Sequence, residues 1–301
     1  MEFVAVGFAV VDTVVSPDGS SRMALGGTVV YGGLAALRHG ARVLVVSLVG
    51  EDFPDEYVLF MARSGLDLTY VRRHRGPTTK FKLVYRDGER CLYLLSRGPD
   101  IGAEHLPDSL EGAIAFVGAV AGEVSPSTLV RIAEEAEAVS LDLQGYLRRV
   151  GEGGVVELAR PAGLEVVVRA CSVVHADERE AEVATGSSSP SSAARELVEM
   201  GCDAALVTMG EEGSYVATEG EVLYVPAARP ERVVDSTGAG DVFTAIFSVE
   251  YYRSGDLLWA SAMASAASSF LVEEPGLGGL VDRKRVEERA NSVLEEIARI
   301  G

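Results

Sequence analysis

The residues best suited to chemistry form a short run of small side chains at 235–241, Asp-Ser-Thr-Gly-Ala-Gly-Asp. Apolar residues with helical spacing follow, which places Gly238, Ala239 and Gly240 at a helix N-terminus. Unpaired N–H groups and the positive end of the helix dipole favour an anion such as a phosphate there. Asp241 adds a carboxylate in the first helical turn. The same residues are also ordinary turn and capping residues, so the run alone allows a capped helix without a ligand.

The composition and charge of the chain limit the classes of protein to which it can belong. The chain has 301 residues, 48% of them hydrophobic, and a formal net charge of −18, which suits a large globular domain. The acidity argues against nucleic acid and against anionic membrane surfaces, since both are bound by basic patches. No run approaches the about 20 apolar residues of a membrane span, and we expect a cytoplasmic protein. Three widely spaced cysteines predict neither a disulfide framework nor a zinc site.

Apolar runs that alternate with helical patterns predict a mostly parallel sheet with helices on both faces. The predicted strands are 2–11, 42–49, 113–120, 139–143, 171–175 and 204–208, and the predicted helices are 29–39, 55–64, 126–137, 155–162, 178–185 and 192–200. A serine-rich run at 187–192 predicts a mobile surface loop. Ligands of such sheets bind at the carboxyl ends of the strands. The polar residues at those ends are Asp12, Asp52, Asp142, Asp177 and Thr208.

Two segments depart from this alternation. Residues 79–85 and 90–95 have strand patterns and are joined through Asp87-Gly88, a strong hairpin signal. With a turn near Pro17, they predict a small antiparallel sheet, formed by residues 12–25 and 77–97, that acts as a lid on a single catalytic domain spanning 1–301. Lys80 is either a phosphate ligand or a solvated lysine on an edge strand.

Two motifs together resemble the ribokinase-like, or PfkB, family of carbohydrate kinases over essentially the whole chain. One is Gly26-Gly27 with its helix and Val-Gly-Glu-Asp at 49–52; the other is the run 235–241, preceded by Thr-Met-Gly-Glu-Glu-Gly at 208–213. The resemblance implies a three-layer α/β sandwich with a mostly parallel central sheet and a small lid. It also implies ATP-dependent transfer of the γ-phosphoryl group to a hydroxyl of a sugar-like substrate, with Asp241 as general base. We expect the helix dipole to keep Asp241 ionised and therefore a weak base.

The same resemblance assigns the other site residues. Asp177 and Glu180 match the family's Asn-x-x-Glu pair, which holds Mg²⁺ largely through water; Asp in place of Asn keeps an oxygen ligand and adds a charge. Asp235 and Thr237 match positions that bind a monovalent cation such as K⁺ in several members, although turn formation alone would explain both. The remaining matches are Gly238, Ala239 and Gly240 for the transferred phosphoryl group, Asp12, Gly26 and Gly27 for the substrate, and Thr208, Gly210 and Gly213 for the nucleotide.

Departures from the sugar-kinase pattern narrow the acceptor. Sugar kinases of the family usually carry Asn where this chain has Tyr31, and an aromatic ring cannot replace amide hydrogen bonds, so ribokinase specificity is not expected. Residues 141–148 and 174–177 resemble archaeal myo-inositol kinases of this family. By that resemblance Gln144 binds inositol hydroxyls and Arg148 reaches the substrate or the transferred phosphate; a surface salt bridge is the alternative for Arg148. We expect His175 to be packed, neither catalyst nor ligand.

The favoured hypothesis is therefore a polyol kinase, with myo-inositol as acceptor and ATP, Mg²⁺ and K⁺ as cofactors. A nucleoside or other sugar kinase of the same fold is the alternative, since Tyr31 could pack against a planar base. A non-catalytic nucleotide-binding regulator is a third hypothesis, and the presence of Asp241 disfavours it. The expected partner is a small polyol or sugar. The phosphorylated hydroxyl stays open, as does the choice between a monomer and a homodimer formed through the lid.

Overall fold

A computed structural model describes residues 1–15, 18–86 and 89–300. The turns expected at Pro17 and at Asp87-Gly88 fall outside the described residues. The main sheet has the strand order β16-β15-β14-β13-β12-β9-β8-β1-β4-β5, parallel from β13 to β5 and antiparallel at β14, β15 and β16. The strands are β1 (Glu2–Val6), β4 (Arg42–Gly50), β5 (Asp67–His74), β8 (Ala113–Val117), β9 (Ala138–Asp142), β12 (Val173–Asp177), β13 (Ala204–Thr208), β14 (Ser214–Thr218), β15 (Val222–Val225) and β16 (Ala298–Arg299).

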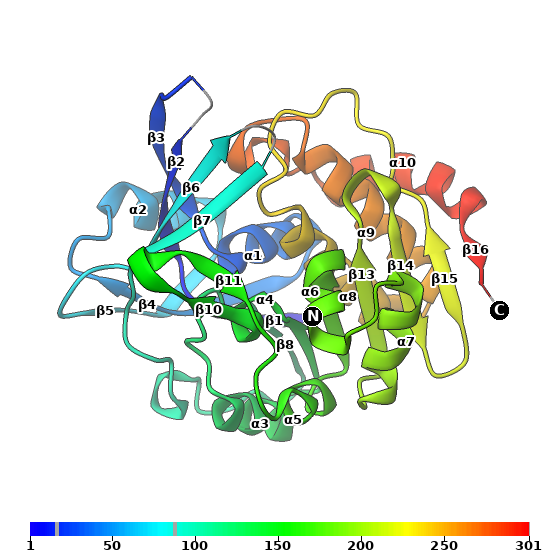
Figure 1. Ribbon diagram of the computed structural model, residues 1–301, viewed down its shortest axis with the longest axis horizontal. Helices are drawn as coiled ribbons and strands as arrows, with labels where there is room; N and C mark the ends of the chain where they lie inside the picture. Colours follow the sequence, from blue (N-terminus) through cyan, green and yellow to red (C-terminus); the bar gives the residue numbers. More distant parts are fainter. Residues whose placement is uncertain (16–17, 87–88, 301) are drawn as a thin grey trace.

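Helices cover both faces of this sheet (Figure 1). On one face lie α3 (Pro126–Glu135), α5 (Leu164–Arg169), α6 (Glu178–Thr185) and α7 (Pro190–Glu199). On the other lie α1 (Thr28–Arg38), α2 (Asp55–Ser64), α8 (Ala239–Ser254), α9 (Leu257–Leu271) and α10 (Arg283–Glu296). No helix in the described part of the chain is long and apolar enough to cross a bilayer.

Strand β1 shows why the central strands have continuous apolar runs. Val4 and Val6 pack into the core on one face, whereas Phe3 and Ala5 pack into the core on the other. Successive side chains of a strand point to opposite faces, so a strand buried on both sides needs apolar residues throughout. This confirms the expected α/β sandwich with helices on both faces.

A four-stranded lid sheet, in the order β3-β2-β6-β7, lies over one end of the main sheet. Its strands are β2 (Val10–Val15), β3 (Ser21–Gly26), β6 (Lys80–Arg86) and β7 (Glu89–Ser96). Both hairpins are antiparallel, as expected, and a parallel pairing of β2 with β6 joins them. A ribbon of β10 (Arg148–Val150) and β11 (Val156–Leu158) lies beside β7 and meets it at a bridge between Val155 and Tyr93 (Figure 1).

Two local expectations are wrong. The helix expected at 155–162 is replaced by strand β11, in which Val156 and Leu158 are partly buried and Glu157 is exposed; this alternation suits a half-covered strand, and helix α5 begins only after Gly163. The serine-rich run at 187–192 is not all loop. Helix α7 already begins at Pro190, because proline suits the first helical position and the Ser189 hydroxyl caps the Ser192 N–H.

Candidate active site

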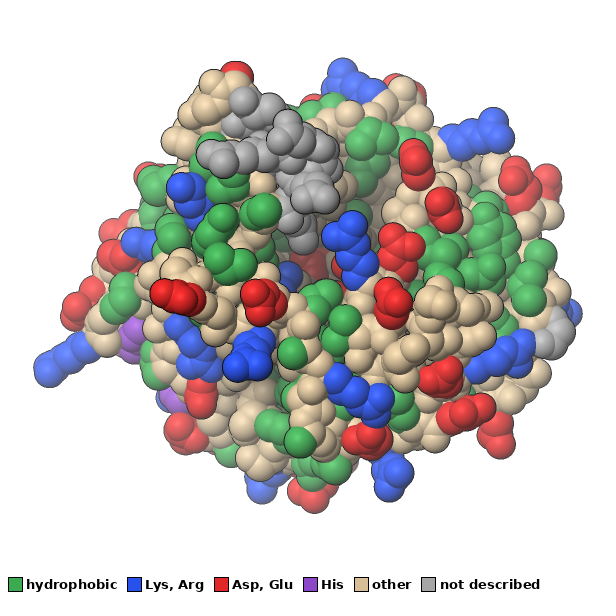
Figure 2. All heavy atoms as spheres, viewed as in Figure 1, with side chains coloured by type: hydrophobic (Ala, Val, Ile, Leu, Met, Phe, Trp, Pro, Cys, Tyr) green, Lys and Arg blue, Asp and Glu red, His purple; other side chains and the backbone are tan. Residues whose placement is uncertain are grey.

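A cavity of about 470 Å³ separates the lid from the carboxyl ends of the central strands. Its walls include Asp12 and Phe81 from the lid strands, residues 236–241 at the start of α8, and residues 177–180 at the start of α6. Figure 2 shows this face of the molecule, where Lys and Arg side chains stand singly among Asp and Glu and form no basic stripe. This face therefore shows no continuous basic track of the kind that binds a nucleic acid.

The loop that ends in Asp241 is clamped between two aromatic rings. Gly238 has φ 81°, and a Cβ on it would lie 2.2 Å from Cδ1 of Tyr31. A Cβ on Gly240 would lie 2.8 Å from Cε1 of His175. This packing therefore requires glycine at both positions. Tyr31 is only 3% exposed, so its ring mainly supports the loop.

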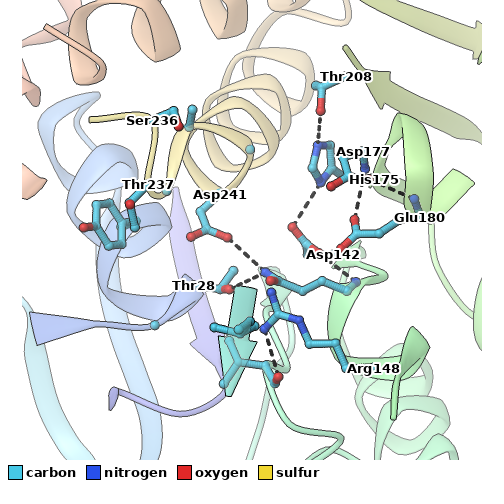
Figure 3. Close-up of a pocket in the computed structure, with 18 of the residues that line it drawn as sticks. Thr28, Asp142, Arg148, His175, Asp177, Glu180, Thr208, Ser236, Thr237 and Asp241 are labelled. Carbon is cyan, nitrogen blue, oxygen red and sulfur yellow. Dashed lines mark hydrogen bonds and ion pairs between the residues drawn. The ribbon is translucent and has the colours of Figure 1, made fainter. Parts of the chain in front are cut away.

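Asp241 lies at the N-terminus of α8 and faces the cavity (Figure 3). The side-chain amide of Gln144, at the start of α4 (Gln144–Leu147), places its Nε2 3.3 Å from Asp241 Oδ1 and 2.9 Å from Thr28 Oγ1. Burial and the nearby Asp142 carboxylate raise the pKa of Asp241 to about 6, against opposing effects of Thr28, His175 and Arg148. The pKa of Asp241 is therefore shifted in the opposite direction to the one expected from the helix dipole, because burial and Asp142 outweigh the dipole.

The glycine pair lets α1 begin directly against the lid. A Cβ on Gly26 would lie 2.0 Å from Oδ2 of Asp12, and one on Gly27, where φ is 103°, would lie 2.2 Å from the carbonyl oxygen of Phe8. Without these Cβ atoms the Asp12 carboxylate has room at the cavity wall. Gly26 itself stands behind Asp12, outside the cavity lining.

Arg148 points into the cavity and not outward to solvent. Its Nη1 donates to the carbonyl oxygen of Val120 at 3.0 Å, and its guanidinium lies 5.7 Å from the ring centre of Phe81 on the lid. Across the described residues, no salt bridge engages Arg148. The geometry favours the predicted place beside the substrate over the surface ion pair.

His175 connects the strand ends on the predicted nucleotide side. Its Nδ1 lies 3.0 Å from Asp142 Oδ2 and its Nε2 lies 3.1 Å from Thr208 Oγ1 (Figure 3). Burial disfavours charge on the ring, but Asp142 together with the Glu180 and Asp177 carboxylates outweighs it, so the pKa of His175 is raised. His175 is packed, as expected, and it also fixes the side chain of Thr208 at the cavity.

Asp177 and Glu180 cap the start of α6 reciprocally. Asp177 Oδ1 accepts the Glu180 N–H at 2.8 Å, and Glu180 Oε2 accepts the Asp177 N–H at 3.0 Å. Burial, then Asp142 and Asp177, raise the pKa of Glu180 to about 7. No cluster of three metal-ligating side chains occurs among the described residues. Two carboxylates with a free oxygen each still suit Mg²⁺, which is usually held by one or two carboxylates, water and substrate phosphates.

Other predicted residues lie at the edge of the site or away from it. Lys80 pairs with Asp52 at the base of the lid and does not line the cavity. Asp235 also stands behind the lining; its oxygens accept the N–H groups of Thr237 at 3.0 Å and Gly276 at 3.2 Å and the Arg22 guanidinium at 3.1 Å. Thr237 and Gly210 line the cavity, whereas Gly213 forms the turn into β14.

Two cavity residues, Thr28 and Arg179, escaped the sequence reasoning. Thr28 follows the glycine pair and Arg179 lies between Asp177 and Glu180, so proximity to a motif could have indicated them. Phe81 and Ser236 also line the cavity; they belong to the predicted lid segment 77–97 and to the run 235–241.

Comparisons with known proteins agree with this geometry. The pfkB family carbohydrate kinase model matches residues 32–283. The chain is 27% identical to the cytidine kinase of Thermococcus kodakarensis over 262 residues, 85% of this chain and 91% of that protein. It shares the fold of a pyrophosphate-dependent kinase in the ribokinase family complexed with a pyrophosphate analog and myo-inositol, at 22% identity and TM-score 0.82, covering 95% of this chain and 99% of that one.

Ribokinase of Arabidopsis thaliana, complexed with ribose and ATP, has the same fold at 21% identity and TM-score 0.77, covering 96% of this chain and 98% of that one. The fold is thus ribokinase-like, as the two glycine motifs indicated. The matched region contains Asp241 and the glycine loop before it, and it extends over most of the sheet. This chain is a kinase, and it belongs to the pfkB family of carbohydrate kinases.

Proposed function

We propose that this kinase transfers the γ-phosphoryl group of ATP to a hydroxyl of a small polyol, with myo-inositol as the acceptor. The observation that carries the proposal is the place of Asp241. Its carboxylate stands at the N-terminus of α8, within the cavity, beside the N–H groups of Gly238 and Gly240 and the amide of Gln144, while the Ala239 N–H donates to the carbonyl oxygen of Ser236 at 3.2 Å. A base and an anion site on one helix turn suit the attack of a hydroxyl on a phosphoryl group.

The acceptor end of the cavity suits a compact polyhydroxylated ring. Asp12, Asp241 and the side-chain oxygen of Gln144 offer acceptors, and Arg148 offers donors. The lid contributes the apolar side chains Phe81, Leu83 and Leu92. A polyol presents hydroxyls around its edge and C–H groups on its faces, so it needs polar partners at the rim and an apolar cover.

The nucleoside alternative loses part of its basis. It relied on Tyr31 as a platform for a planar base, yet the Tyr31 ring is 3% exposed and packs against Gly238. Tyr31 lines the cavity, but little of its surface is exposed there for stacking on a base. The likeness to a cytidine kinase keeps cytidine among the acceptors to be compared.

In the proposed reaction, the residues of this chain align the reacting groups and stabilise the charge on the transferred phosphoryl group. Asp241 orients the acceptor hydroxyl and takes its proton late, when the new O–P bond has largely formed. The N–H groups at the start of α8 stabilise the charge on the transferred group. Phe81 and the rest of the lid exclude water, which favours transfer to the acceptor over hydrolysis.

Two cations belong to this proposal. Asp177 and Glu180 would hold Mg²⁺, which neutralises phosphate charge when bound. K⁺ at Asp235 and Thr237 stays a prediction: three donors already engage Asp235, so K⁺ would have to displace Arg22 or bind other oxygens. Measuring the rate against KCl concentration, at constant ionic strength set with a tetramethylammonium salt, tests it.

A substrate panel with product detection tests the function. The acceptors are myo-inositol, ribose, fructose and cytidine, each with ATP and with pyrophosphate as donor, because a structural neighbour uses pyrophosphate. We expect ATP-dependent formation of an inositol monophosphate, identified by ³¹P NMR. Turnover of cytidine or a sugar without turnover of inositol would refute the acceptor, and turnover with pyrophosphate alone would refute the donor.

The role of Asp241 has its own test. Asp241→Asn should abolish turnover with any acceptor while ATP binding, measured by calorimetry, stays nearly intact. Asp282→Asn, at the exposed N-cap of α10, is a matched carboxylate control that should keep full activity. Undiminished turnover by Asp241→Asn would contradict its role as base.

A further inference from the structure

Thr28 occupies a place that the proposed mechanism does not yet use. It is the first residue of α1, is 1% exposed, and lines the cavity between the predicted acceptor and phosphate sites. Its Oγ1 accepts a hydrogen bond of 2.9 Å from Nε2 of Gln144, the same nitrogen that lies 3.3 Å from Oδ1 of Asp241 (Figure 3). One amide nitrogen therefore ties a threonine hydroxyl to the carboxylate of the proposed base.

The fold holds the Thr28 side chain in one orientation. Gly118, just after β8, leaves room for it: a Cβ there would lie 2.2 Å from Cγ2 and 2.5 Å from Cβ of Thr28. The Thr28 methyl group therefore packs closely over the Gly118 backbone. A β-branched side chain has few allowed rotamers, so fixing the methyl also fixes the hydroxyl. In this orientation the hydroxyl meets Gln144.

The hydrogen-bond inventory assigns the protons. An amide NH₂ group has two hydrogens, so Nε2 of Gln144 can donate to Thr28 and to Asp241 at once. The Thr28 hydroxyl, which accepts from Gln144, keeps its own hydrogen for a neighbouring acceptor. Its interaction with the Asp241 carboxyl acts against the burial and the Asp142 charge that raise the pKa of Asp241. Hydrogen bonding to a carboxylate favours the ionised form.

We propose that Thr28 is a positioning residue for the base: its hydroxyl holds the Gln144 amide against Asp241, and together they aim the carboxylate at the acceptor hydroxyl. This inference rests on the proposed role of Asp241. The other charged or titratable groups that act on Asp241 come from three further elements: Asp142 at the end of β9, Arg148 at the start of β10 and His175 on β12. Tyr31, on α1, also lies within electrostatic reach of Asp241.

The test compares Thr28→Val, which keeps the shape and loses the hydroxyl, with Thr28→Ser, which keeps the hydroxyl. Thr128→Val is the matched control, because Thr128 is also buried and bonded through its hydroxyl, but to Ser125 at the start of α3. The assay measures kcat and kcat/KM from pH 5 to 9 with the acceptor and donor that the wild-type protein turns over. Thermal unfolding and circular dichroism establish that each variant is folded.

We expect Thr28→Val to lower kcat at least tenfold at pH 6 and to leave the donor KM unchanged. Its acid limb in kcat/KM should move to higher pH by about 0.5 to 1 unit, the size of one lost hydrogen bond to a carboxylate. Thr128→Val should behave as wild type, and Thr28→Ser, which keeps the hydroxyl but loses the methyl that fixes it, should lower kcat less than Thr28→Val does and should move the acid limb less. If Thr28→Val does not fold, Thr28→Ala removes the same hydroxyl without adding a contact and carries the same expectation.

Each possible result either supports or overturns the proposed role of Thr28. A wild-type kcat and pH profile in folded Thr28→Val overturns the proposal, and so does a fall in kcat without movement of the acid limb, which would indicate a packing role only. Asp241→Asn separates this inference from the proposed function. If that variant is inactive and Thr28→Val is normal, only the role of Thr28 fails; if Asp241→Asn stays active, the base assignment fails and the role of Thr28 fails with it.

Discussion

Ionising Asp241 should destabilise the folded protein. Burial and Asp142 raise its pKa from 3.8 to about 6, and each pKa unit corresponds to about 1.4 kcal/mol, so the cost of the charged form is about 3 kcal/mol. The folded state binds this proton more tightly than the unfolded state does. The penalty is therefore absent below pH 4, grows as the pH rises from about 4 to about 6, and is complete above that range.

Asp241→Asn removes the charge and keeps the shape. At pH 8 we expect the variant to exceed the wild type in free energy of unfolding by up to about 3 kcal/mol, which corresponds to several degrees in Tm. At pH 4 the two proteins should have similar stability. Urea denaturation at both pH values measures the difference, and Asp282→Asn, which removes an exposed carboxylate and keeps a capping side chain, should show no such gain.

The pH dependence decides whether the reasoning holds. A variant that is less stable than the wild type at pH 8 would show that hydrogen bonds from Gln144 and the dipole of α8 outweigh burial and Asp142. An equal gain at pH 4 and pH 8 would show that the gain does not come from ionisation. Either result would refute a pKa near 6 and restore the weak base expected from the helix dipole.

Three further predictions concern the same site. The acid limb of kcat/KM for the wild-type protein should have its midpoint near pH 6, with a rise of about tenfold between pH 5 and pH 7; a midpoint near 4 would contradict it. Arg22→Met, which breaks the 3.1 Å pair between lid strand β3 and Asp235, should raise the acceptor KM and change the free energy of unfolding by less than about 1 kcal/mol, because Arg22 is largely exposed; an unchanged KM in steady-state assays would count against a role in holding the lid. Gly238→Ala combines a strained φ of 81° with a contact of 2.2 Å to Tyr31, so it should lower the unfolding free energy by more than about 1 kcal/mol and lower kcat; wild-type values of both would refute the clamped loop.

Much of the fold could be predicted because the signals were local. The apolar run of β1 reports burial on both faces, and the glycine loop before Asp241 reports a helix start. The prediction of a helix at 155–162 was wrong because the signal that decides its structure is not local. Its apolar residues suit a helix or a strand equally, and contact with β7 in the lid, at Tyr93, decides between them.

In the site, too, some features follow from the local sequence and others only from the packed structure. Residue types and spacing marked Asp241 and Asp12 as carboxylates at a helix start and a strand end, and the family resemblance added the expected roles of these two residues and of Gln144. The packing role of Tyr31 could not be predicted from the sequence. The sequence places Tyr31 one turn after the glycine pair, and only the packed structure puts its ring against Gly238, about 200 residues away along the chain.

The sequence by itself determined the class of chemistry, because the N–H groups of a helix start and the carboxylate beside them depend on consecutive residues. Tertiary structure decided how that chemistry is tuned. The Gln144 amide that contacts Asp241 is 97 residues away, and its other partner, Thr28, is 116 residues from Gln144. Burial and charge from such distant segments set the pKa and the direction of the carboxylate, and neither quantity can be summed from neighbours along the chain.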